Sequence, residues 1–332
     1  MIRGERALAM KGFVVKLAAA VGFVALSSAY CLAADKVNLA YGALSGLQSP
    51  LWVAKEAGYF SKHGIDAQVL LIVGGRVITQ AMLAGEVQMG VASMAALLQA
   101  NVAGGDLVYV GYFGSKTDYA LFSTKDITDI KQLQGKRIGI GQFGGGPDFT
   151  SRIVLEKFGL RPDKDVRIVQ MLVPDSGRLA ALQSGAIESI LLQAPTSLKA
   201  MALGFNQLVD YSTVLPFPLA SLTTTRRFVR QNPGLTKRIV AAHLDAVRHI
   251  FKNEESTVKI LAQYTKITDR PFLSEYHRKI ILPRLSQTLV PDMPAIEYIL
   301  DLEKKRNPPA AKLKADNLVD TSFLDELKKE GY

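Results

Sequence analysis

The chain has 332 residues, of which 48% are hydrophobic and 21% charged, a balance typical of globular proteins and unlike that of disordered ones. This length is sufficient for two domains with separate cores. The formal net charge is +10, but no basic stripe with interleaved aromatic side chains occurs, so we expect no nucleic-acid binding.

The N-terminus has the features of a secretory signal peptide. Four basic residues precede an apolar run at 17–26, and small residues follow it. The run is too short to cross a membrane. We therefore expect residues 1–33 to be a signal peptide, cleaved after Ala33 or Ala34, and the mature protein to be periplasmic.

Cleavage would change both the cysteine count and the charge. Cys31 is the only cysteine and follows Tyr30, where a lipid-modified cysteine needs a small neighbour, so we expect no lipid anchor. A mature chain without a thiol would have no disulfide, thiolate catalysis or cysteine-ligated metal. It would carry 36 basic and 29 acidic residues, and most of the excess positive charge lies from Leu219 onwards. We interpret this basic region as a solvated face or a docking surface.

The first run of elements begins with an apolar strand at 37–42 and a glycine-bearing loop. Ser49 is the expected N-cap of a helix at 50–62, with Pro50 at its first position and left-handed Gly64 after its end. We expect further strands at 66–73, 88–92 and 107–113 and helices at 76–84 and 94–102.

A second run with the same pattern starts near Tyr119. We expect its strands at 119–124, 137–141, 166–172, 188–193 and 207–211, and its helices at 129–134, 148–158, 176–184 and 195–203. Alternating strands and helices predict parallel sheets covered on both faces. Met82–Val87 is echoed by Leu182–Ile187, which indicates two similar lobes; the alternative is that α/β proteins commonly end helices in this way.

Prolines at 216 and 218 interrupt the second run, and 220–228 has the pattern of a returning strand. Helices are then expected at 234–252, 255–265, 272–287, 294–305 and 322–330. These helices need a sheet to cover, and the first lobe is the natural partner. We therefore predict a discontinuous lobe 1 (36–115 plus 217–332), an inserted lobe 2 (116–216), and a hinge of two segments between them.

Residues 50–60, P-L-W-V-A-K-E-A-G-Y-F, with Gly64-Ile65-Asp66, resemble an element of the solute-binding proteins of ABC importers. The subgroup is the nitrate, taurine, alkanesulfonate and thiamine-precursor type. Residues 133–139, L-Q-G-K-R-I-G, are similar to another of its segments. The resemblance implies a two-lobed class II periplasmic binding protein fold, α/β with two doubly wound sheets. It also implies closure on a small-molecule ligand and delivery to a membrane permease and its ATPase, and we expect a monomer.

In such a fold, ligand groups come from loops at the carboxyl ends of the strands. Several of these loops start helices, whose unpaired N–H groups can hold a carboxylate or sulfonate. The candidate ligand-binding residues are Ser45, Gln48, Ser49, Gly74, Gly75, Arg76, Ser93, Met94, Phe143, Gly144, Gly145, Gly146, Gln193, Ala194 and Pro195.

Each candidate also has a structural interpretation. Ser49 and Ser93 can simply cap helices, the glycines at 144–146 can form a flexible turn, and Arg76 can be a surface residue. We assign Trp52 and Phe60 to the core. The four histidines share no metal-ligand spacing, so we expect neither a metal nor a catalytic site.

The pattern Gly139-x-Gly141-x-x-Gly144 matches a dinucleotide fingerprint. We expect Gly139 to lie within a strand and find no acidic residue that clearly ends the next strand, so no nucleotide cofactor is expected. The leading hypothesis is a binding protein for a small organic anion such as a sulfonate or an aromatic carboxylate. The alternatives are a pyrimidine or thiamine-precursor binding protein, or a pyrimidine-processing enzyme of the same fold.

Overall fold

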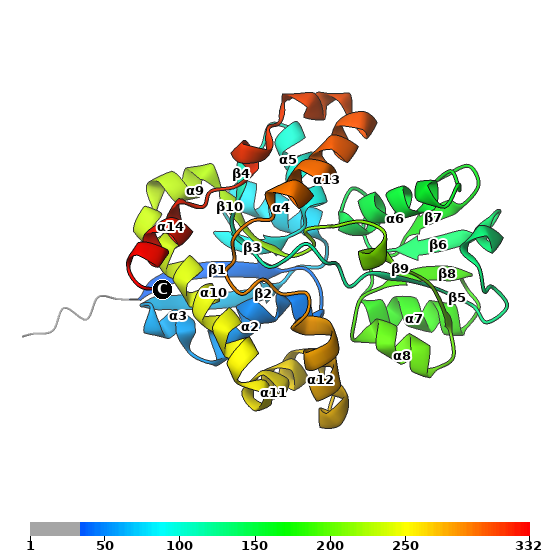
Figure 1. Ribbon diagram of the computed structural model, residues 1–332, viewed down its shortest axis with the longest axis horizontal. Helices are drawn as coiled ribbons and strands as arrows, with labels where there is room; N and C mark the ends of the chain where they lie inside the picture. Colours follow the sequence, from blue (N-terminus) through cyan, green and yellow to red (C-terminus); the bar gives the residue numbers. More distant parts are fainter. Residues whose placement is uncertain (1–33) are drawn as a thin grey trace, which may run out of the picture. The chain divides into compact units, whose positions relative to one another are not determined.

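The computed structural model describes residues 34–332; the expected signal peptide at 1–33, including Cys31, lies outside the described residues. The described chain contains two five-stranded sheets with helices packed on them (Figure 1). The strand orders are β2-β1-β3-β10-β4 in the first sheet and β7-β6-β8-β5-β9 in the second. In each sheet the fourth strand, β10 or β5, is the one that the chain forms after it passes over from the other sheet. The two halves are therefore alike, as the echoed glycine patterns predicted.

The strands largely match the ranges expected from the sequence. The first sheet contains β1 (Asp35–Tyr41), β2 (Ile65–Leu71), β3 (Met89–Ala92), β4 (Leu107–Tyr112) and β10 (Ser221–Thr225). The second contains β5 (Ala120–Ser123), β6 (Arg137–Ile140), β7 (Arg167–Gln170), β8 (Ser189–Leu192) and β9 (Asn206–Asp210).

The prediction of purely parallel sheets is wrong, because each sheet contains one antiparallel strand. β10 runs antiparallel to β3 and β4, and β5 runs antiparallel to β8 and β9. These are the two strands that the chain forms directly after it passes from one sheet to the other. A chain arriving at the carboxyl ends of the parallel strands enters the sheet in the opposite direction, so both strands have to be antiparallel.

Helices flank the strands in the order expected for two α/β halves. Those following strands of the first sheet are η1 (Gly46–Gln48), α2 (Ser49–Glu56), α3 (Tyr59–Lys62), α4 (Gly75–Ala84) and α5 (Met94–Val102). Those of the second are η2 (Ile130–Leu133), α6 (Gly146–Lys157), α7 (Asp175–Gln183), α8 (Thr196–Ala202) and η3 (Tyr211–Thr213). The C-terminal helices are α9 (Arg226–Gln231), α10 (Pro233–Lys252), α11 (Glu254–Thr265), α12 (Arg270–Tyr276), the π-helix η4 (His277–Ile281), α13 (Met293–Arg306), η5 (Pro308–Lys312), η6 (Ala315–Leu318) and α14 (Ser322–Lys329).

Several predicted elements differ in detail. The helix expected at 50–62 is broken at Gly58, whose φ of 77° is left-handed. Ser49 is not an N-cap, because it lies inside the first turn of α2 and makes no capping hydrogen bond; Ser45 caps the preceding η1 instead. The strand expected at 220–228 ends at Thr225, whose hydroxyl caps α9. The helix expected at 272–287 ends in the π-helix η4, and the one at 129–134 is 3₁₀-helical.

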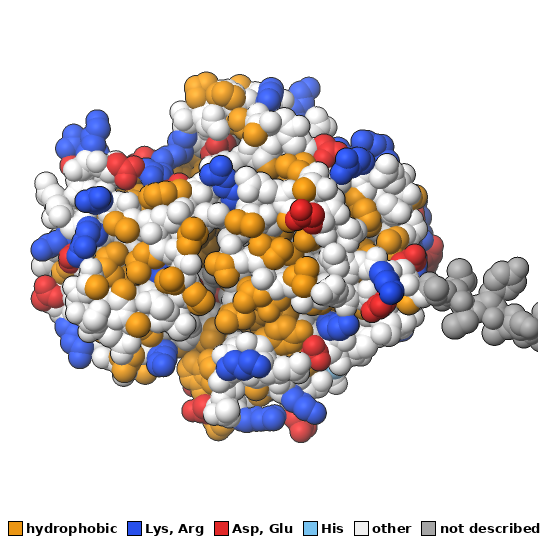
Figure 2. Space-filling view, turned by 180° about the vertical axis from the view of Figure 1, so that it is seen from behind, with side chains coloured by type: hydrophobic (Ala, Val, Ile, Leu, Met, Phe, Trp, Pro, Cys, Tyr) orange, Lys and Arg blue, Asp and Glu red, His pale blue; other side chains and the backbone are white. Residues whose placement is uncertain are grey.

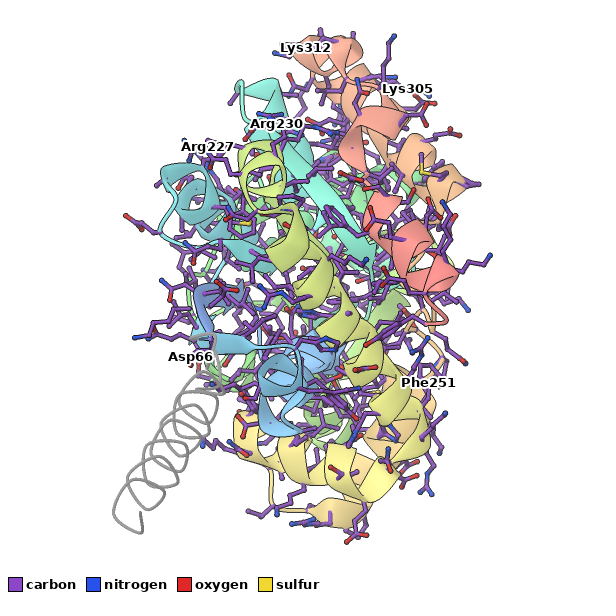
Figure 3. All side chains as sticks on the ribbon, turned by 90° about the vertical axis from the view of Figure 1, so that its left-hand side faces the viewer. Asp66, Arg227, Arg230, Phe251, Lys305 and Lys312 are labelled. Carbon is purple, nitrogen blue, oxygen red and sulfur yellow. The ribbon has the colours of Figure 1, made fainter. Side chains whose placement is uncertain are left out.

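The C-terminal helices cover the first sheet, as their apolar faces required. α10 packs against α2, α3 and α14, and α13 packs against α5. Trp52 and Phe60 are fully buried in this core, which confirms their structural assignment. Basic side chains of this region, labelled Arg227, Arg230 and Lys305 in Figure 3, are exposed and do not line the cavity described below. No helix within residues 34–332 is long and apolar enough to cross a membrane.

The chain passes between the sheets twice, at 113–119 and 211–220. The two passages run side by side, because the Phe217 N–H donates to the Ser115 carbonyl at 2.6 Å. The first passage is also tied to the C-terminal region by a 2.7 Å bond from the Ser286 N–H to the Phe113 carbonyl. Gly114, with a φ of 142°, lies where any side chain would collide with the Arg284 carbonyl.

Candidate functional site

A cavity of about 740 Å³ is lined from both sheets. Its walls are the loops that follow β1, β2 and β3 on one side and β6, β7 and β8 on the other. Residues Thr265–Asp269, which run from the end of α11 to the start of α12, and Phe272 of α12 form a third wall. The carboxyl ends of strands in α/β sheets are where such folds bind small molecules, so this cavity is the candidate site.

Apolar side chains from both sheets dominate the rim of the cavity. Leu71 and Val73 contribute from the end of β2, and Leu172 and Val173 from the loop after β7. All four remain more than a third exposed although they are large and hydrophobic. Seen from behind, hydrophobic side chains gather beside a hollow near the middle of the molecule (Figure 2). Such a lining suits the apolar part of an organic molecule.

Two helices begin with glycine at the cavity, one from each sheet. α4 starts at Gly75 and α6 at Gly146. The first N–H groups of a helix have no partner within the helix and attract negative charge. A Cβ on Gly146 would lie 3.3 Å from the Ser93 Cβ of the other sheet, so the glycine allows a close approach there.

A polar cluster of Ser45, Asp118, Gln193 and Tyr276 joins the two sides of the cavity. Ser45 follows β1 in the first sheet and donates its hydroxyl to Asp118 at 2.7 Å. Gln193, after β8 in the second sheet, donates its side-chain N–H to the other Asp118 oxygen at 2.9 Å. Burial raises the pKa of Asp118 to about 6, although both hydrogen bonds and Arg284 act to lower it.

Tyr276 makes the second connection of the polar cluster. Its hydroxyl accepts a hydrogen bond from the Gly46 N–H at 2.6 Å and donates one to the Ala194 carbonyl at 2.8 Å. Gly46 belongs to the first side and Ala194 to the second. A single buried phenol from α12 therefore holds loops of both sheets.

The one buried cationic side chain of the lining is already neutralised. Arg178 forms an ion pair with Asp175 and donates to the carbonyls of Val173 and Leu191. Burial raises the pKa of Asp175, while Arg178 and the backbone N–H of Gln193 act to lower it. The other lysine and arginine side chains of the lining, Lys199 and Lys266, are exposed.

The cavity brings together many, though not all, of the residues expected from the sequence. Those lining it are Ser45, Gln48, Gly74, Gly75, Ser93, Gly145, Gly146, Gln193 and Pro195. The remaining six are not part of the lining: Ser49, Met94 and Ala194 are buried behind it, Arg76 and Phe143 are exposed, and Gly144 packs against Gln99.

The structure also explains the dinucleotide-like glycine pattern. Gly139 lies inside β6, as expected, and a Cβ there would meet the Met171 sulfur at 2.5 Å. This glycine therefore serves packing within the sheet. Within residues 34–332 no group of three or more His, Cys, Asp or Glu side chains is arranged to hold a metal ion.

Sequence reasoning missed several residues at the cavity. Asp118 and Tyr119 directly precede β5, the first strand of the second run. An acidic residue next to a buried strand could have indicated a functional role there. Arg178 lies on α7, one turn beyond the loop after β7, where an arginine within a helix gave no indication of a role at the site. The wall at Thr265–Asp269 and the hydroxyl of Tyr276 come from the C-terminal helices, for which no local pattern indicated a role at the site.

Curated relatives include both binding proteins and an enzyme. A putative binding protein of Brucella abortus is 28% identical over 220 residues, covering 65% of this chain and 67% of the relative. The 4-amino-5-hydroxymethyl-2-methylpyrimidine phosphate synthase of Schizosaccharomyces pombe is 31% identical over 116 residues, covering 34% of this chain and 33% of the enzyme.

Among solved structures, the alkanesulfonate-binding protein SsuA of Xanthomonas axonopodis pv. citri bound to MOPS matches with a TM-score of 0.71. The sequence identity is 17%, and the match covers 86% of this chain and 98% of that one. This similarity confirms the periplasmic binding protein fold. The profile of the family described as NMT1/THI5 like matches residues 48–257. The chain therefore belongs to the NMT1/THI5-like family.

Proposed function

We propose that this protein is the extracytoplasmic solute-binding subunit of an ABC importer, which captures a small organic anion between its two sheets. The observation that carries the proposal is the cavity lined from the carboxyl ends of both sheets. Its apolar rim suits the body of an organic molecule, and the helix starts at Gly75 and Gly146 suit an acidic group. Sulfonates and aromatic carboxylates are the leading classes.

In this proposal the protein captures its solute when two lobes close on it. Lobe 1 comprises 36–115 and 217–332, lobe 2 comprises 116–216, and the paired passages between the sheets form the hinge. A ligand that contacts both lobes stabilises the closed form by its additional contacts. The permease would then receive the solute from the closed protein. Export through the predicted signal peptide places the mature chain in the periplasm, and the mass of the secreted protein would test the cleavage site.

A thermal-shift screen of sulfonates, aromatic carboxylates and pyrimidines tests the proposal. A ligand present at 100 times its dissociation constant adds about 2.7 kcal/mol to the free energy of unfolding, which is a readily measured shift. Small-angle scattering with any ligand found should show compaction. Tight binding without compaction would contradict capture by closure.

The second candidate is a pyrimidine-processing enzyme, favoured by the match to the yeast synthase over 116 residues. The described residues that line the cavity include neither histidine nor cysteine, which supports ranking the binding protein first. Chemical turnover of a bound pyrimidine, followed by mass spectrometry, would reverse this order.

A further inference from the structure

Gln48 carries a buried hydrogen-bond acceptor at the cavity. The residue ends η1, is 4% exposed and belongs to the lining. Its backbone N–H donates to the Ser45 carbonyl, but its side-chain Oε1 has no hydrogen-bond partner among residues 34–332. Burying an amide oxygen without a donor is unfavourable, so this atom favours an occupant of the cavity that supplies one.

Two neighbouring hydroxyl groups direct their protons elsewhere, while that of Ser49, also buried, has no hydrogen-bond partner among residues 34–332. Ser45 donates its hydroxyl to Asp118, and Tyr276 donates its hydroxyl to the Ala194 carbonyl. The side-chain N–H of Gln193 also points to Asp118. The polar cluster thus consumes its own donors and does not provide one for Gln48.

The rest of the cavity limits what the donor can belong to. Leu71, Val73 and Leu172 form an apolar rim, and the helix starts at Gly75 and Gly146 offer N–H groups. An occupant that satisfies all three features has an acidic group, an apolar body and a separate N–H or O–H group.

Building on the function proposed above, we propose that Gln48 determines specificity by accepting a hydrogen bond from the solute. The substrate class is then organic acids that carry an amino or hydroxyl group, in preference to plain alkyl or aryl acids of the same size. A rotation of the terminal amide brings Oε1, which is buried in the structure, to the solute, and Oε1 selects by the penalty of remaining unpaired when the solute offers only a methyl group.

Two matched pairs of probes test this selection by titration calorimetry. 3-Hydroxy-1-propanesulfonate is compared with 1-butanesulfonate, and 4-aminobenzoate with 4-methylbenzoate. In each pair a neutral hydroxyl or amino group replaces a methyl group of similar size, and the two members carry the same charge. We expect the hydroxyl or amino compound of at least one pair to bind the unmodified protein roughly tenfold or more tightly than its methyl counterpart does.

Variants of Gln48 assign the preference to its side chain. Gln48→Met keeps the length and removes the acceptor, so the preference should disappear while the methyl compound binds as before. Gln48→Glu keeps an acceptor and should retain the preference. Gln80→Met, at an exposed glutamine of α4 that lies outside the lining, is the matched control and should change neither affinity by more than about twofold. Melting temperatures establish that each variant is folded.

The outcomes separate this inference from the proposed function. Equal affinities within both pairs, or a preference that survives in Gln48→Met, would overturn the role of Gln48 but leave solute capture standing. Failure of all four probes to bind would overturn the proposed class of organic acids, and the role of Gln48 with it.

Discussion

At the residue scale, the hydroxyl of Tyr276 connects two loops that lie 230 and 82 residues away in sequence. Tyr276 is buried, so neither the Gly46 N–H nor the Ala194 carbonyl would regain its bond from bulk water if the hydroxyl were removed. The sequence contains no local pattern for such a contact, because a tyrosine in a helix normally indicates core packing alone.

Tyr276→Phe should therefore lower the free energy of unfolding by about 1–3 kcal/mol, because two buried polar groups lose their partner. Urea denaturation measures the change. Tyr264→Phe is the matched control: its hydroxyl donates to the exposed Glu56, and we expect a loss below about 0.5 kcal/mol. Equal losses in the two variants would contradict the connecting role of Tyr276.

Asp118 makes stability depend on pH. Its pKa is about 6 in the folded protein and 3.8 ordinarily, so the folded state binds the proton more tightly. The resulting stabilisation is complete below about pH 4 and is lost as the pH rises through about 6.

Asp118→Asn removes this titration. Between pH 4 and pH 7, we expect the free energy of unfolding of the wild-type protein to fall by on the order of 2 kcal/mol relative to that of Asp118→Asn. Denaturant unfolding at a series of pH values measures the difference. Asp66→Asn, at an exposed position on β2 (Figure 3), should follow the wild-type curve. A constant gap between wild type and Asp118→Asn across this range would show that the carboxyl group titrates normally.

At the scale of the elements, the start of α6 approaches the start of α5. A Cβ on Gly146 would lie 3.1 Å from the Phe217 ring and 3.2 Å from the Ser93 hydroxyl. The sequence offered the glycines at 144–146 as ligand-binding residues or as a flexible turn. The neighbours that limit Gly146 are the Phe217 ring, from the second passage between the sheets, and Ser93, which caps α5, and only the folded pairing of the two sheets brings them together.

Gly146→Ala should destabilise the protein by about 1–3 kcal/mol, since a tightly packed contact must move to admit the methyl group. Gly234→Ala is its control, because Gly234 also lies in the first turn of a helix, α10, but has open space around its Cβ position. That change should be neutral or slightly stabilising. Thermal or urea unfolding compares the two, and an unchanged stability of Gly146→Ala would mean that the contact is loose.

The sequence predicted elements well where a repeat or a glycine marks them. The strands of both sheets and α10, α11 and α13 lie close to their expected ranges. The antiparallel direction of β5 and β10 escaped prediction, because hydrophobic alternation is the same for either direction. The break at Gly58 escaped it too, since a single glycine within a helical pattern is ambiguous until its φ is known.

At the scale of the whole molecule, hinge closure makes a prediction that needs no ligand. Ser93 and Gly146 come from different sheets, and their Cβ positions would be 3.3 Å apart, close to the separation in a disulfide. The mature chain expected from the sequence has no other cysteine, so within one chain an engineered pair at these positions has no alternative partner.

The oxidised Ser93→Cys/Gly146→Cys protein should keep the two sheets together. If the free protein opens, small-angle scattering should give a smaller radius of gyration for the oxidised form than for the reduced form, and a reducing agent should reverse the change. Ser93→Cys alone controls for the loss of the Ser93 cap on α5. Identical scattering of both forms would contradict opening of the free protein.

The wall formed by Thr265–Asp269 and Phe272 lies beyond residue 257, where the match to the family ends. It is attached to α11 and α12 and takes no part in either sheet. Changes in its length or side chains can therefore alter which solute fits without disturbing the strands or the passages between them. Relatives that share the matched region can differ in solute specificity through this one segment. Grafting the segment between two such proteins offers a direct way to exchange their specificities.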